Sequence, residues 1–109
     1  LQEIDRNLFK VRPIDKVIVK GRTKPVEIFE VISRAHPMAK NPDSLQHYLT
    51  GKQFFEQKNF KGALEVFEQI LLMLPEDKPT KRLRDLCGKY LAQPEAVTED
   101  FDVTKMTEK

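Results

Sequence analysis

The strongest pattern of apolar and polar positions lies between Phe60 and Leu74. Apolar residues recur there at the i, i+3, i+4 and i+7 spacing of one helical face. They are Phe60, Ala63, Leu64, Phe67, Ile70, Leu71 and Leu74. Val66 and Met73 add apolar surface outside this stripe, so the polar edge is narrow. A stripe this wide predicts a central helix packed between two neighbouring helices.

Two flanking stripes supply those neighbours. The upstream stripe consists of Leu45, Tyr48, Leu49 and Phe55, and the downstream stripe of Leu83, Leu86, Cys87, Tyr90 and Leu91. Asp43, Asn59 and Asp77 are residue types that cap helix N-termini, and each precedes one of the three stripes. Pro75 and Pro94 end the second and third helices. We therefore predict three helices over residues 43–93.

The first third of the chain has the alternation of strands. A β-branched run at Val17–Val19 and a second apolar run at Val26–Ile32 are separated by a stretch containing Gly21 and Pro25. This arrangement predicts a β-hairpin. The second run is apolar on both alternating faces, which is typical of strands covered on both sides. Three helices can cover one face at most, so we predict that the other face and at least one strand edge meet a partner.

The predicted fold class is α+β, a β-hairpin followed by a three-helix antiparallel unit and a polar tail. The strands occupy residues 1–33, a linker rich in proline and small residues occupies 34–42, the helices occupy 43–93, and the tail occupies 94–109. The tail has three sizeable apolar side chains, Phe101, Val103 and Met106. It either docks through them or stays loose.

Charge and composition exclude several partners. The net charge of +2 is too small to favour nucleic acid, and the longest apolar run, Ile70–Leu74, is too short to cross a membrane. We therefore expect no nucleic acid and no direct membrane contact. The strand segment is locally basic, and we interpret its charges as solvated side chains that protect a strand edge. They are Lys10, Arg12, Lys16, Arg22 and Lys24.

No catalytic or metal-binding constellation is visible. His36, His47 and Cys87 lack metal-ligand spacing, so Cys87 is interpreted as a core residue. The acidic pairs at 76–77 and 99–100 are interpreted as loop carboxylates with capping roles. One cysteine also excludes an internal disulfide.

The run FKVRPIDKVIVKGRTKPVEIFEV, residues 9–31, resembles the last strands of the class III adenylate/guanylate cyclase catalytic domain. That domain commonly ends with R-x-[IL]-D-x-V-x-V-K-G and a following Pro-Val. The helical part resembles the tetratricopeptide-like tail that follows many bacterial cyclase domains. Its matching residues are Phe60, Ala63, Phe67, Pro75, Asp77, Cys87, Phe101, Val103 and Lys109. The two resemblances follow one another and cover most of the chain.

The resemblance implies that the chain is the C-terminal part of a class III nucleotide cyclase, which makes cyclic AMP or cyclic GMP from ATP or GTP. Lys20, before Gly21, is the residue that would approach the β- and γ-phosphates. Two divalent ions, magnesium or manganese, would be held by carboxylates outside this chain, which itself carries no catalytic residue and needs no cofactor. The helices would be a structural or regulatory appendage.

The same resemblance implies partners and a location. The strands would pair with the rest of the catalytic domain. A homodimer through that domain is one possibility, because class III sites form between two catalytic domains, and the oligomeric state is left open. The expected location is cytoplasmic, with membrane anchoring of the parent by upstream segments left open. The preference for ATP or GTP is also left open.

The alternative is a free-standing tetratricopeptide-like protein-interaction module without catalysis. Gly51, Phe54, Ala63, Phe67 and Pro75 fall at the spacing of that repeat, but a single repeat does not form an array. The small residues Gly51 and Ala63 predict a close approach of the first two helices. Two spaced aspartates and an Asn-x-x-x-Arg helix upstream of Leu1 would favour the cyclase.

Overall fold

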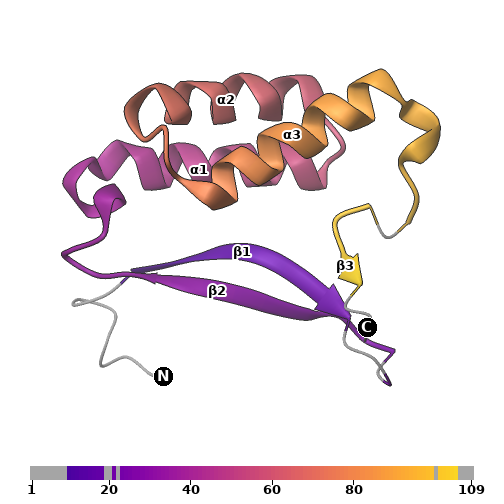
Figure 1. Ribbon diagram of the computed structural model, residues 1–109, viewed down its shortest axis with the longest axis horizontal. Coiled ribbons are helices and arrows are strands. Elements are labelled where there is room, and N and C mark those ends of the chain that lie inside the picture. The colour runs from indigo at the N-terminus through magenta and orange to yellow at the C-terminus, as the bar shows by residue number, and fades with distance from the viewer. Residues whose placement is uncertain (1–9, 19–20, 22, 100, 106–109) are drawn as a thin grey trace.

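The computed structural model describes residues 10–18, 21, 23–99 and 101–105, and it confirms the α+β class. An antiparallel hairpin is followed by three helices that lie together on one side of it, with β1 nearer to them than β2 (Figure 1). The elements in chain order are β1 (Lys10–Ile18), β2 (Val26–Ile32), η2 (Pro37–Lys40), α1 (Pro42–Glu56), α2 (Phe60–Met73), α3 (Lys78–Ala92), η3 (Pro94–Ala96) and β3 (Thr104–Lys105).

The hairpin pairs Lys10 with Ile32 at one end and Val17 with Val26 at the other. Its register shifts between Pro13 and Asp15, where a proline without an N–H interrupts the ladder. Gly21 in the turn has a φ of +86°, a conformation that glycine adopts without steric cost. The predicted hairpin is confirmed, and its first strand begins earlier than the Val17–Val19 run.

A third strand was not predicted from the sequence. The two-residue strand β3 pairs in parallel with the end of β1, which gives the sheet order β2-β1-β3. The tail therefore docks. Phe101 packs among Phe55, Phe60 and Tyr90, with ring centroids 5.4–6.1 Å from each of them. The Tyr90 hydroxyl also donates a hydrogen bond of 2.7 Å to the backbone carbonyl of Phe101.

The central position of α2 is confirmed, because α2 packs against both α1 and α3. The core is formed mainly by the predicted apolar stripes and is extended by two residues from outside the helices, Ile32 and Met38. Met38 belongs to η2, so the predicted linker contributes to the core. No helix among the described residues is long and apolar enough to span a membrane.

The helix starts agree with the predicted caps in part. The Asn59 side chain accepts a hydrogen bond from the Gly62 amide at the start of α2, as predicted. The predicted cap Asp43 is wrong, because α1 begins at Pro42, a residue preorganised for the first helical position. Asp77 occupies the N-cap position of α3, but its carboxylate makes no capping hydrogen bond.

Gly51 brings α1 close to α2, as the sequence predicted. A Cβ atom added at Gly51 would lie 2.6 Å from the Phe67 ring, and Phe67 is fully buried. Gly88 is also inside a helix, but a Cβ atom there would meet no neighbour within 4 Å. Both glycines therefore lie inside helices, but Gly51 is packed against Phe67 whereas Gly88 has open space beside it.

We predict that Gly51→Ala destabilises the protein by about 1–3 kcal/mol, because the Phe67 ring must move in a packed core. Gly88→Ala should stabilise it by about 0.5–1 kcal/mol through helix propensity alone. Urea denaturation of both variants measures the two changes. Equal effects at the two positions would contradict the close approach of α1 and α2.

Candidate functional site

Arg12 of β1 is fully buried, which contradicts the prediction of a solvated charge at a strand edge. Its guanidinium donates two hydrogen bonds to the Asp77 carboxylate, at 2.9 and 2.7 Å. A third hydrogen bond of 2.8 Å runs from Nε to Glu30, which is directly opposite on β2. The guanidinium carbon also lies 4.7 Å from the centre of the Tyr48 ring. Arg12 thus joins both strands to α1 and to the start of α3.

The polar groups around Arg12 are mutually satisfied. Thr80 donates a hydrogen bond of 2.5 Å to Asp77, and the Tyr48 hydroxyl donates one of 2.7 Å to the backbone carbonyl of Pro13. Burial favours the neutral form of Asp77, but its hydrogen bonds from Arg12 and Thr80 outweigh that effect and hold its pKa below the ordinary value. Burial raises the pKa of Tyr48, so its hydroxyl stays a donor.

A second ionic contact holds the other end of β1. The Lys16 ammonium lies 2.9 Å from the Asp102 carboxylate in the tail. The hydrogen bond to Asp102 raises the pKa of Lys16. Asp102 lies two residues before Thr104, which pairs with Val17, so the ion pair and the strand pairing hold the same end of β1.

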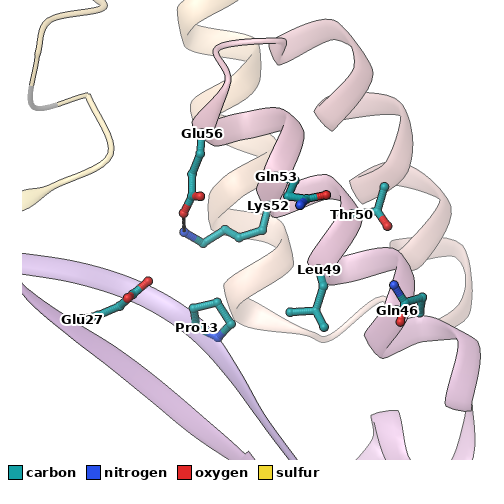
Figure 2. A pocket seen from close by; sticks show the side chains of 8 residues that line it. All are labelled: Pro13, Glu27, Gln46, Leu49, Thr50, Lys52, Gln53 and Glu56. Atoms are coloured by element: carbon teal, nitrogen blue, oxygen red, sulfur yellow. Dashed lines mark hydrogen bonds and ion pairs between the residues drawn. The ribbon is translucent and has the colours of Figure 1, made fainter.

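A pocket of about 370 Å³ lies between the hairpin and α1 (Figure 2). Pro13 and Glu27 border it from the hairpin, and its other side is formed by α1. The Lys52 and Glu56 side chains point toward each other there and form an ion pair of 3.3 Å, with the Lys52 side chain 8% exposed. The pocket shows that the hairpin is not packed continuously against α1.

The hairpin leaves much apolar surface uncovered. Five of its apolar side chains are between 38% and 53% exposed, namely Val11, Val26, Ile28, Phe29 and Val31. Because successive strand residues point to opposite faces, Ile28 and Phe29 leave both faces of β2 exposed. The outer edge of β2 has no partner strand among the described residues. A strand of this kind is a template for pairing with another chain segment.

The remaining sequence candidates have structural roles. Cys87 is buried in the core, as predicted, and burial raises the pKa of its thiol to about 12. The His47 ring lies 2.6 Å from the Asp43 carbonyl, and His36 accepts a hydrogen bond from the Met38 amide. No group of three potential metal ligands exists within residues 10–18, 21, 23–99 and 101–105. Lys20 lies outside the described residues.

Comparison with known proteins gives one similarity that bears on function. The chain is 32% identical over 74 residues to the terminal-differentiation-specific adenylate cyclase of Dictyostelium discoideum. The match covers 66% of this chain and 4% of that protein. A continuous match of this size includes residues 40–70 wherever it begins, so it contains α1 and most of α2. No protein-family model and no solved structure matches the chain.

We predict that Asp77→Asn destabilises the protein by about 1.5–3 kcal/mol, because it removes one of the two carboxylates that bind the buried Arg12 among the described residues and leaves Glu30. Glu76→Gln is the matched control. Its ion pair with Lys81 is 3.5 Å long and its side chain is 92% exposed, so little change is expected. Denaturant unfolding of both variants at neutral pH measures the difference.

The same contact predicts a pH dependence. A carboxylate whose pKa is depressed by folding stabilises the protein above its unfolded pKa, about 3.9, and that contribution is lost as the pH falls through the folded value. The free energy of unfolding should therefore decrease below about pH 4 in the wild type. The decrease should be smaller in Asp77→Asn. Parallel pH profiles for the two proteins would rule out Asp77 as the group responsible.

Proposed function

We propose that this chain is the C-terminal part of a nucleotide cyclase, comprising the last strands of its catalytic domain and a helical appendage. The observation that carries the proposal is the 32% identity to an adenylate cyclase, in a match that extends over α1 and most of α2. The match supports a relationship to a cyclase, and the assignment of the strands to the end of a catalytic domain depends on the sequence motif at residues 9–31.

The exposed hairpin supports the same proposal. Both faces of β2 carry exposed apolar side chains, and its outer edge is open within the described residues. Exposed apolar side chains on both faces of a strand are suited to burial by a covering layer, and an open edge accepts another strand. The preceding part of a catalytic domain would supply both the covering layer and the neighbouring strand. A free-standing helical module has no need of such a hairpin.

The proposed reaction is attack by the ribose 3′ oxygen of ATP or GTP on the α-phosphorus, with pyrophosphate as the leaving group. Lys20 is our candidate for the group that binds the β- and γ-phosphates. Two divalent metal ions would be held by carboxylates outside this chain. The proposed enzyme is a cytoplasmic catalytic domain that works as a homodimer.

The chain alone should bind neither ATP nor GTP with useful affinity, since the proposed metal carboxylates and base-reading segments lie elsewhere. Titration with manganese and ATP, followed by backbone amide chemical shifts, measures binding. Saturation in the micromolar range would show that the chain contains a nucleotide site of its own.

In the full-length protein, Lys20→Ala should reduce cyclase turnover without unfolding the enzyme. An ammonium group beside the departing pyrophosphate interacts more strongly as the bond to the α-phosphorus breaks, so both kcat and kcat/KM should fall. Loss of one such charge-stabilising donor costs about 2.7–4 kcal/mol in comparable anion sites. Cyclic nucleotide formation by purified enzyme measures the effect.

Arg22→Ala is the matched control, because it removes a positive charge two residues further along the chain. Its activity should change much less than that of Lys20→Ala. Full activity in Lys20→Ala would remove Lys20 from the phosphate site. If the full-length protein lacks, before Leu1, the two spaced aspartates that would hold the metal ions, the protein-interaction module is favoured instead.

A further inference from the structure

Strand β1 is held by parts of the chain that lie far from it in the sequence. Arg12 binds Asp77 at the start of α3, Tyr48 of α1 binds the Pro13 carbonyl, and Lys16 binds Asp102 in the tail. The three contacts fall within five consecutive positions of one strand. They restrain both the position of β1 along its length and its rotation.

Apolar packing contributes a smaller part of this attachment. Among the described hairpin residues, Ile32 of β2 belongs to the main hydrophobic core, and Val17 of β1 is buried outside that cluster. The pocket beside Pro13 separates part of the hairpin from α1 (Figure 2). Polar contacts of defined geometry therefore supply the directional restraint on how β1 lies on the helices. Apolar contacts, being non-directional, would restrain it less specifically.

We propose that the helical unit and the tail position β1 and thereby regulate the catalytic site of the parent enzyme, a role that rests on the proposed function. Arg12, Asp77, Lys16 and Asp102 are positioning residues in this proposal. Strand β1 ends at Ile18, two residues before Lys20 in the sequence. The contacts that hold β1 therefore act on the strand that leads into Lys20 in the sequence. The appendage is thus a means of adjusting turnover.

Amide hydrogen exchange tests the mechanical part of this proposal on the chain itself. Asp77→Asn and Asp102→Asn each remove one anchor, and Glu76→Gln is the control. In both anchor variants the acceleration of exchange relative to the wild type should be about two- to thirtyfold larger for the β1 amides than for the α2 amides. Asp102→Asn should fold even if Asp77→Asn does not, because the partner of Asp102, Lys16, is partly exposed and can be solvated when the ion pair is lost. The test can then be made with Asp102→Asn alone.

Cyclase assays on the full-length protein test the functional part. Each anchor variant should lower kcat/KM by about two- to thirtyfold, and the loss should disappear in a Lys20→Ala background. A general loss of folded enzyme would lower activity by the same factor in both backgrounds. The double-mutant comparison therefore separates positioning of β1 from simple destabilisation.

Unchanged β1 exchange in both variants would overturn the proposal. Faster exchange with unchanged turnover, or equal losses with and without Lys20, would overturn it as well. Failure of the wild-type full-length protein to form a cyclic nucleotide would overturn the proposed function and the regulatory role with it. In that case the exchange rates still show whether the tail restrains β1.

Discussion

The burial of Arg12 is the constraint on which the placement of the hairpin against the three helices depends. A guanidinium removed from water must have its charge and its donors satisfied, or the folded state loses several kcal/mol. Arg12 is satisfied only when Glu30 of β2 and Asp77 at the start of α3 meet it together, beneath the Tyr48 ring. The hairpin and the helices are therefore held in the one orientation that completes this set.

The parts predicted well were those whose signal is local. The helices follow from apolar residues repeating every three or four positions, and β2 follows from a β-branched run after Pro25. Arg12 was misjudged because a charged residue within a strand looks the same whether it is solvated or paired. Its partner Asp77 lies 65 residues away, and nothing near Arg12 indicates it. A buried charge requires an acidic partner, but one sequence does not show which carboxylate is within reach.

Two smaller misjudgements have similar causes. Strand β3 has two residues, too few to show any alternation, and it follows Phe101, whose ring packs against Phe55 of α1. Asp77 was correctly placed at the start of α3, but its expected capping bond is absent. Its carboxylate is used by Arg12 and Thr80 instead. The preference of aspartate for helix starts indicated where Asp77 lies. Its contact with the distant Arg12 determines what its carboxylate binds.

The helices bury most of their apolar side chains among themselves, whereas the hairpin does not. The helices enclose a core in which Tyr48, Phe55, Phe67 and Ile70 are almost fully inaccessible to solvent. The hairpin exposes apolar side chains on both faces, although two strands alone are marginally stable in water. Attachment to the helices therefore helps to keep the hairpin folded. Replacement of a buried ion pair by apolar side chains of the same volume is often neutral or stabilising, so such pairs add little net stability. An attachment made through Arg12 and Lys16 is thus better suited to fixing the direction of β1 than to increasing stability, and this favours a positioning role for the appendage.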